Sequence, residues 1–367
     1  MIMPTIRAGL NLPWKRKLYN MPQIDAYFKE MENQGASDLH MVIGFPPLIR
    51  LRGELVALDQ PVLTAETNQR ILFEILSEEQ IKRVEKDRDF DMAYALDGVG
   101  RFRCNYFYQY RGLGAVFRLI PTRILTLEEL NLPDVLKNIS EYKKGLVLVT
   151  GPTGSGKSTT LAAMIDYIND RRSAHIITIE DPLEFVHQNR KCIFTQREIG
   201  THARSFADAL VVAGRENPDI ILVGEMRDTE TISLALTCAE LGILVFGTLH
   251  TNSAAKTIDR IIDAFPSDQQ PQARTMLAES LRAVIAQQLV KTSDGKGRRA
   301  ANEILLGSSA LASMIRENKI SQITSMIQTG TAVGMQTMDQ HLQQLVKEQK
   351  ITKEAAHEKA MNKSLFA

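Results

Sequence analysis

The amino-acid sequence predicts an α/β protein with a mainly parallel central sheet, preceded by a smaller α+β domain. The first observation is length, because 367 residues are enough for two ordinary domains. The second is a series of short segments with strand-like patterns between residues 37 and 120. The third is a repeated succession of a continuous apolar run and a helical segment from residue 145 onward. This succession is typical of a parallel sheet covered by helices.

The smaller domain is expected at residues 21–120. A helix should follow Met21, because Ile24, Tyr27, Phe28 and Met31 fall on one helical face. Residues 64–85 are also expected to be helical, and Asp97-Gly98 is a hairpin signal. The predicted strands are residues 46–55, with a turn at Gly53, and residues 89–96, 101–110 and 114–121.

Residues 1–20 contain four basic residues and no acidic residue. Pro4 and Pro13 interrupt their apolar residues, so they lack the continuous apolar core of a secretory signal. We expect a disordered extension, or residues that do not belong to the native chain. An ordered N-terminal arm is the alternative.

A connector is expected at residues 121–144, followed by the α/β domain at residues 145–367. Its tail, from about residue 267, is expected to be largely helical. The predicted strands are residues 145–150, 175–180, 219–224 and 243–249, and the predicted helices are residues 158–171, 205–214, 229–241 and 253–264.

Composition excludes several classes of protein. Hydrophobic residues make up 44% of the chain and charged residues 24%, so the chain is not disordered throughout. A net charge of +1 and an aromatic content of 6% offer little to a nucleic acid, and no nucleic-acid partner is expected. The three cysteines include no pair at metal-ligand spacing and form no plausible disulfide framework, which favours a cytoplasmic location. No stretch approaches the ~20 continuous apolar residues of a membrane span.

The strongest motif is a phosphate-binding loop. It fits G-x-x-x-x-G-K-[ST], follows a predicted buried strand and opens a predicted helix, which is the required context. Its backbone N–H groups would converge on the phosphates of ATP, Lys157 would reach the terminal phosphates, and the Ser158 hydroxyl would ligate Mg²⁺. The expected nucleotide-binding residues are Gly151, Pro152, Thr153, Gly154, Ser155, Gly156, Lys157, Ser158 and Thr159.

Further polar residues follow the neighbouring strands. Glu225 is placed to orient or deprotonate the attacking water, and the alternative is an acid that complements a helix dipole. Glu180, Asp181 and Glu184 end another strand. They would hold Mg²⁺ through water or steady the nucleophile, or they form only a solvated turn. His250 ends the fourth strand and is a candidate γ-phosphate sensor or proton partner, or a structural histidine.

Taken together and in this order, these stretches resemble the secretion ATPase superfamily that powers type II secretion and type IV pili. Residues 35–55 and 334–340 resemble the pilus retraction ATPases within it, and the likeness covers nearly the whole chain. The matching motifs are GPTGSGKST (151–159) for Walker A, IEDPLEF (179–185) for the Asp box, DIILVGEMRD (219–228) for Walker B and GTLHTNSAAKTIDRIIDAFP (247–266) for the His box.

The resemblance implies a homohexamer with a PAS-like N-terminal domain and a RecA-like ATPase domain. It also implies ATP-driven work on the inner-membrane platform protein of the pilus machine, from the cytoplasmic face of that membrane. By motif, Glu225 would be the catalytic glutamate, Glu184 the essential acid and His250 the His-box histidine. Arg101, Arg103 and Arg118 would be the family's arginines. Arg101 and Arg103 lie two apart on a predicted strand, hence on one face, where they would neutralise transition-state charge.

The sequence departs from the retraction pattern at Ala312 and Ser313, where an arginine and an asparagine are usual, and at Gly214, where a leucine is usual. An accessory retraction ATPase, acting beside a paralogous motor, is therefore an alternative. The four-cysteine zinc insertion of the extension ATPases is missing, which disfavours pilus extension. The phosphate-binding loop is also compatible with a RecA-like nucleic-acid translocase and with a nucleotide switch that does not hydrolyse.

Overall fold

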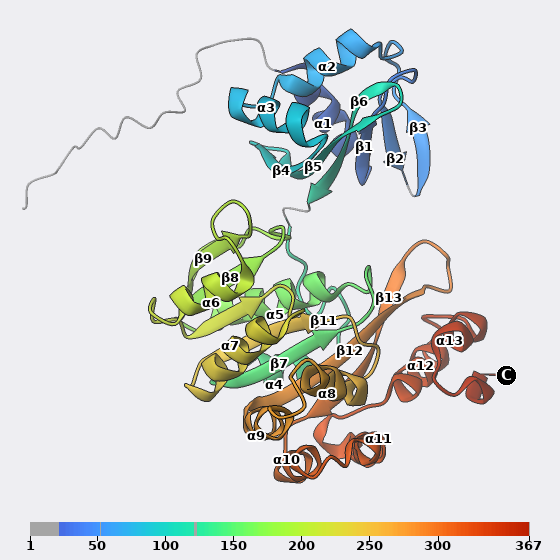
Figure 1. Cartoon of the computed structure of the whole chain (residues 1–367). Helices are drawn as coiled ribbons and strands as arrows, with labels where there is room; N and C mark the ends of the chain where they lie inside the picture. The colour runs from blue at the N-terminus through green and yellow to red at the C-terminus, as the bar shows by residue number, and fades with distance from the viewer. Residues whose placement is uncertain (1–21, 52, 121–122, 367) are drawn as a thin grey trace, which may run out of the picture. The chain divides into compact units, whose positions relative to one another are not determined.

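A computed structural model describes residues 22–51, 53–120 and 123–366. The chain divides into two compact units, the first ending at residue 121 and the second beginning at residue 122 (Figure 1). The expectation for residues 1–20 lies outside the described residues. No helix in the described ranges is long and apolar enough to cross a membrane.

The first unit is an antiparallel sheet with three helices packed on it (Figure 1). The strand order is β3-β2-β1-β6-β5-β4. Alternate β5 side chains enter the core, where Phe102 stacks on Phe28 of α1 with ring centroids 4.0 Å apart. The elements are α1 (Gln23–Asn33), β1 (Asp38–Met41), β2 (Leu48–Leu51), β3 (Glu54–Ala57), α2 (Ala65–Phe73), α3 (Glu78–Asp87), β4 (Asp89–Leu96), β5 (Gly100–Gln109) and β6 (Gly112–Ile120).

The helical stretch expected at residues 64–85 is two helices. Ser77 begins the second, because its hydroxyl accepts from the backbone N–H of Gln80 while the Gln80 side chain accepts from the N–H of Ser77. This reciprocal capping box satisfies amide groups that would otherwise lack partners, and it fixes a helix start in the middle of the segment.

The second unit is built on a seven-stranded sheet in the order β13-β12-β7-β11-β10-β8-β9. Every neighbouring pair is parallel except β12 and β13, which are antiparallel. Strands β7, β10 and β11 are buried along their whole length, as strands covered on both faces should be. The strands are β7 (Gly145–Thr150), β8 (His175–Glu180), β9 (Ile193–Glu198), β10 (Ile220–Val223), β11 (Leu244–Leu249), β12 (Leu281–Lys291) and β13 (Arg298–Leu306).

Helices cover both faces of this sheet (Figure 1). Leu146 and Leu148 of β7 pack with α6 to α9 on one face, and Val147 and Val149 pack with α4 and α5 on the other. The helices are α4 (Val135–Ser140), α5 (Lys157–Arg171), α6 (Phe206–Ala213), α7 (Thr229–Glu240), α8 (Ala254–Asp263), α9 (Gln270–Ser280), α10 (Ser309–Arg316), α11 (Ile323–Thr329), α12 (Met338–Lys347) and α13 (Lys353–Lys359).

Two parts of the second unit differ from expectation. The tail, expected to be largely helical, does form the five helices α9 to α13, but it also contributes β12 and β13 to the central sheet, which no sequence pattern indicated. Residues 123–144, expected as a connector, include α4 and place Leu136 and Ile139 in the core beside α5. Strand β9, which no sequence pattern indicated, extends the opposite edge of the sheet.

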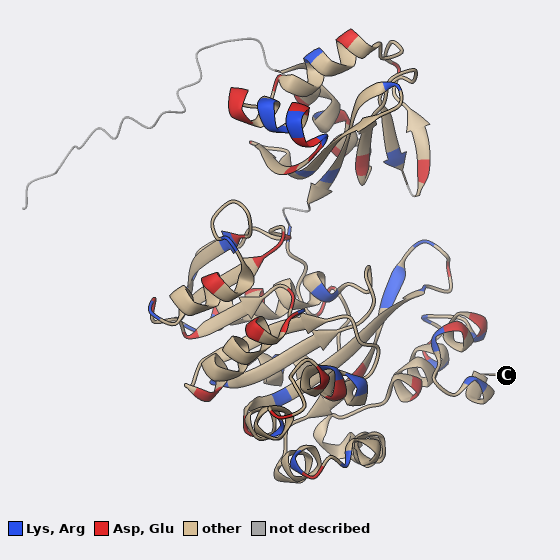
Figure 2. Cartoon of the chain, viewed as in Figure 1, with Lys and Arg blue, Asp and Glu red and all other residues tan. Residues whose placement is uncertain are grey.

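Charged residues of both signs are spread over each unit, and helix α3 of the first unit carries both (Figure 2). Within the described residues, blue and red segments are interspersed along the ribbon of both units.

Candidate active site

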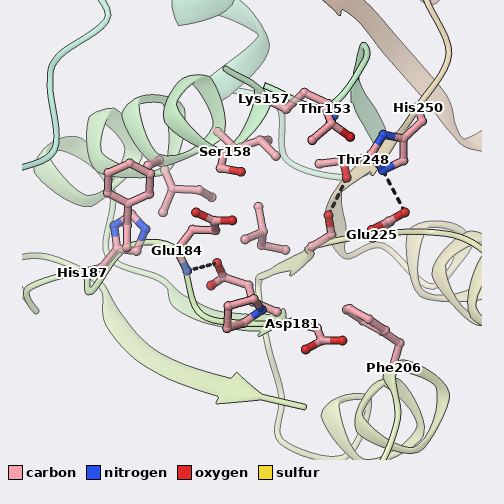
Figure 3. A pocket seen from close by; sticks show the side chains of 18 of the residues that line it. Thr153, Lys157, Ser158, Asp181, Glu184, His187, Phe206, Glu225, Thr248 and His250 are labelled. Carbon is pink, nitrogen blue, oxygen red and sulfur yellow. Dashed lines mark hydrogen bonds and ion pairs between the residues drawn. The ribbon is translucent and has the colours of Figure 1, made fainter. Parts of the chain in front are cut away.

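A cavity of about 200 Å³ lies at the carboxyl ends of the central strands of the second unit. Ends of parallel strands meet at one edge of a sheet, and this edge is where α/β proteins place their sites. The cavity brings together side chains from the phosphate-binding loop and from the ends of β8, β10 and β11 (Figure 3). Predicted site residues that line it are Thr153, Gly154, Lys157, Ser158, Glu180, Asp181, Glu184, Glu225 and His250.

The loop between β7 and α5 has the backbone of a phosphate cradle. Gly154 and Gly156 have φ values of +77° and +84°, which favour glycine, and Gly156 caps the start of α5. A Cβ on Gly151 would lie 2.2 Å from the carbonyl oxygen of Gln287, so only glycine fits there. Helix α5 therefore presents its N-terminus, with Lys157 and Ser158, to the cavity.

Lys157 lies within the loop. Its ammonium donates to the carbonyl oxygens of Gly151, at 2.8 Å, and Pro152, at 3.2 Å. Burial lowers the pKa of Lys157, although the nearby Glu225 carboxylate opposes the shift. A phosphate is the kind of anion that this partly desolvated cation would bind.

The carboxylate of Glu225 is held by the side chains of His250 and Arg227. Its Oε1 atom lies 2.9 Å from Nε2 of His250 (Figure 3). The same oxygen accepts a hydrogen bond from Nε of Arg227. Burial alone would raise the pKa of Glu225, but the hydrogen bond and charge of Arg227, together with His250, hold it below its ordinary value. Glu225 is therefore an ionised carboxylate at neutral pH. No sequence pattern had marked Arg227 as its partner.

Two glycines explain how Glu225 reaches the cavity. A Cβ on Gly224 would lie 3.1 Å from the carbonyl oxygen of Ile179, so glycine lets the end of β10 approach β8 closely. A Cβ on Gly247 would lie 2.4 Å from the sulfur of Met226, which is itself buried. The side chain of Met226 thus fills the space above Gly247, while the preceding residue, Glu225, lines the cavity.

The acidic residues after β8 occupy different environments. Glu180 is buried, and burial, reinforced by the carboxylates of Glu184 and Glu198, raises its pKa to about 7. Its Oε2 accepts from the backbone N–H of Glu184 at 3.1 Å, which fixes the turn (Figure 3). Asp181 and Glu184 are exposed at the cavity. Within the described ranges, no group of three or more His, Cys, Asp or Glu side chains is arranged to hold a metal ion by itself.

The three predicted arginines belong to the first unit. Arg101 and Arg103 lie on β5, and Arg118 of β6 is the register partner of Arg103, so all three share one face of that sheet. Arg118 donates to Oδ1 of the buried Asp38 at 2.8 Å, and Arg103 lies 4.0 Å from Asp91. Their approach to a nucleotide stays a prediction.

Two buried polar residues that the sequence did not single out support the site from behind. Gln287 of β12 donates from Nε2 to the carbonyl oxygen of Ser155, at 2.7 Å, in the phosphate-binding loop. Glu303 of β13 accepts from the backbone N–H of Ala254, at 2.7 Å, at the start of the helix that follows His250. Both lie on strands of the tail, where no strand was predicted, so no signal marked them.

Comparisons with known proteins agree with this geometry. The family model described as type II/IV secretion system protein matches residues 19–366. The type IV pilus retractation ATPase PilT of Pseudomonas aeruginosa is 53% identical over 327 residues, covering 89% of this chain and 95% of the relative. The type IV pilus ATPase PilU of the same organism is 41% identical over 334 residues, covering 91% and 87%.

A solved structure is also similar. It is described as a crystal structure of the pilus retraction motor PilT and bound ADP, and it matches with a TM-score of 0.88 and 46% identity, covering 94% of this chain and 99% of that one. The predicted α/β fold class and the predicted resemblance are confirmed. The chain therefore belongs to the type II/IV secretion system protein family, in the branch of ATPases that includes PilT and PilU.

Proposed function

We propose that this chain is a homohexameric motor that hydrolyses ATP to power the retraction of type IV pili. One observation carries the proposal: a phosphate-binding loop with Lys157 and Ser158 opens into the same cavity as the Glu225–His250 pair. A phosphate-binding loop and an ionised carboxylate at one strand edge are two of the parts that triphosphate hydrolysis uses. The similarity to a solved pilus retraction motor described with ADP supports the choice of nucleotide.

The loop residues bind the nucleotide. Backbone N–H groups between Gly151 and Thr159 and the N-terminus of α5 cradle the phosphates, and Lys157 neutralises them. The residues present fit Mg²⁺, because this ion is usually held by one or two carboxylates together with substrate phosphates and water. Ser158 would supply a direct ligand, and Glu180 and Asp181 would bind through water. When bound, Mg²⁺ neutralises charge on the phosphates.

Glu225 orients and deprotonates the attacking water. His250 and Arg227 restrict the orientation of its carboxylate, and His250 is close enough to exchange a proton with it. Glu184 assists from the opposite side of the cavity as a second acid. Arg101, Arg103 and Arg118 act on the developing γ-phosphate charge, which links hydrolysis to movement of the N-terminal domains.

The partner of the ring is the inner-membrane platform protein of the pilus machine, reached from the cytoplasmic side. The identity of 53% to PilT, against 41% to PilU of the same organism, favours a main retraction motor over an accessory one. A paralogous retraction ATPase is a further expected partner.

The purified full chain, supplied with ATP and Mg²⁺, should release phosphate, and expressing it in a strain that lacks its own copy should restore pilus retraction. An assembled preparation that releases no phosphate, even with the platform protein present, would refute the proposal. Complementation by the native chain alone would identify the main motor. Stimulation of the ATPase by single-stranded DNA would instead favour a nucleic-acid translocase.

A further inference from the structure

The phosphate-binding loop rests on one buried glutamine from the C-terminal half of the sheet. Gln287 is 1% exposed, and its side chain makes three hydrogen bonds. Nε2 donates to the carbonyl oxygen of Ser155 at 2.7 Å, and Oε1 accepts from the hydroxyl of Thr160, in the first turn of α5, at 2.8 Å. One amide thus ties the loop to the helix that it opens. Moreover, a Cβ on Gly156 would lie 3.0 Å from Nε2 of Gln287, so the loop glycine makes room for this contact.

Asn302 of β13 supports the orientation of the Gln287 amide. Its Nδ2 donates to Oε1 of Gln287 at 2.9 Å. If the Gln287 amide were flipped, two NH₂ groups would face one another and the carbonyl of Ser155 would lose its donor, which is costly in a buried place. The Ser155 carbonyl, which can only accept, and the fully buried Asn302 therefore both favour the orientation that holds the loop.

Asn302 is in turn held by the segment that begins helix α12. Its backbone N–H donates to Nδ1 of His341 at 2.9 Å, and its carbonyl oxygen accepts from Nε2 of Gln336 at 2.9 Å. Gln336 also pairs with Ile304 of β13 through both backbone groups. A continuous chain of hydrogen bonds hence leads from residues 336–341 through Asn302 and Gln287 to the phosphate-binding loop.

We propose that Gln287 is a positioning residue for nucleotide binding, and that residues 336–341 set the shape of the phosphate-binding loop through Asn302. This inference rests on the proposed function, because it requires a nucleotide in the loop. Gln287 does not line the cavity and touches the site only through Ser155 and Thr160. The role differs from simple core packing, since it predicts that hydrogen-bonding capacity, and not volume, governs nucleotide affinity.

The test is the dissociation constant for ADP with Mg²⁺, measured on the purified full chain by fluorescence titration. Gln287→Met keeps the volume and removes all three hydrogen bonds, and it should weaken ADP binding by about tenfold or more. Gln288→Met is the matched control, because the next side chain points to the opposite face of the sheet, toward Lys359. The control should bind ADP within about twofold of wild type.

A second variant covers the case in which Gln287→Met does not fold. Asn302→Ala leaves Gln287 in place but removes one of the two donors to its Oε1 atom and loosens its amide, so it should weaken binding by about three- to tenfold. In the double variant, Asn302→Ala should add less than about twofold to the effect of Gln287→Met, because its effect passes through Gln287.

The outcomes separate this inference from the proposed function. If wild type binds ADP and releases phosphate while folded Gln287→Met and Asn302→Ala both bind ADP as wild type does, the inference is wrong and the proposed function stands. Independent, additive effects of the two changes would also refute it. If wild type itself binds no nucleotide, the proposed function fails.

Discussion

At the scale of single residues, the environment of Glu225 decides what it can do. Its carboxylate is hydrogen bonded by Arg227 and His250 on one oxygen, and these partners lower its pKa. This carboxylate is ionised and held in one orientation, and it lies at the strand edge near Lys157. It is therefore suited to align the attacking water. An acid that merely complemented a helix dipole would need no such partners.

The substitution Glu225→Gln tests this role. Glutamine keeps the shape and can still bond to its neighbours, but it cannot accept a proton. We expect ADP affinity close to that of wild type and a kcat lower by about 10²- to 10⁴-fold. Phosphate release and nucleotide titration measure the two quantities separately. Turnover at the wild-type rate would remove Glu225 from the mechanism.

The environment of His187 predicts how the stability of the second unit depends on pH. It lines the cavity and stacks on Phe194 with ring centroids 4.8 Å apart. Burial lowers its pKa from an ordinary value of 6.5 to about 4 in the folded chain. Between these values the unfolded chain binds more protons than the folded chain, so the stability contributed by neutral His187 is lost as the pH falls.

We therefore expect the free energy of unfolding of the second unit to fall as the pH drops from about 6.5 to about 4. In His187→Phe, which keeps the aromatic stack, the decrease should be shallower by up to about 1 kcal/mol per pH unit. Urea denaturation at several pH values measures this slope. Above about pH 7, the free energies of unfolding of wild type and variant should differ by a constant amount. Equal slopes would mean that His187 is accessible to protons in the folded chain.

At the scale of secondary-structure elements, the pair β12–β13 is the largest departure from expectation. Residues 281–291 contain leucine, alanine and glutamine, which are good helix formers, and a continuous apolar run does not by its periodicity distinguish a buried strand from a buried helix. Pairing with β7 on one side and β13 on the other outweighs that preference. Gln287 and Glu303 gained their roles only through this pairing.

A substitution at Gly307 tests the pairing of β12 with β13 at a position outside the candidate active site. A Cβ there would lie 2.6 Å from the carbonyl oxygen of Leu281 and 3.0 Å from Cα of Arg282, both backbone atoms at the start of β12. Gly307→Ala should lower the free energy of unfolding by about 1–3 kcal/mol.

The control is Gly214→Ala, where the nearest atom would be 3.8 Å away and the change should stay within about 0.5 kcal/mol. Thermal or urea unfolding of both variants gives the comparison. Equal stability of the two would show that β12 and the residue after β13 do not approach as described.

At the scale of the whole molecule, the candidate groups are divided between the two compact units. The phosphate-binding loop and Glu225 are in the second, and Arg101, Arg103 and Arg118 share a sheet face of the first. If nucleotide chemistry uses both units, hydrolysis and domain movement are coupled, which is what a motor requires.

Arg103→Ala should then reduce phosphate release by at least about tenfold while the chain still assembles into rings of the wild-type size. Arg111→Ala, which removes an exposed arginine from the turn between β5 and β6, should leave the rate unchanged. Size-exclusion chromatography with light scattering reports assembly, and phosphate release reports the rate. Unchanged turnover in Arg103→Ala would mean that this arginine is a solvated strand residue that pairs with Asp91.

The sequence by itself determined the fold class, the phosphate-binding loop and the acids and histidine at the strand ends, because each rests on local patterns with a fixed spacing. The strands β7, β8, β10 and β11 were predicted within one residue of their ends for the same reason. Only the tertiary structure decided that the tail joins the sheet, that Arg227 and His250 share one oxygen of Glu225, and that Gln287 supports the loop. These contacts join residues from different strands and loops, many of them far apart in the sequence, and hydrogen bonding at such distances leaves no periodicity in the chain.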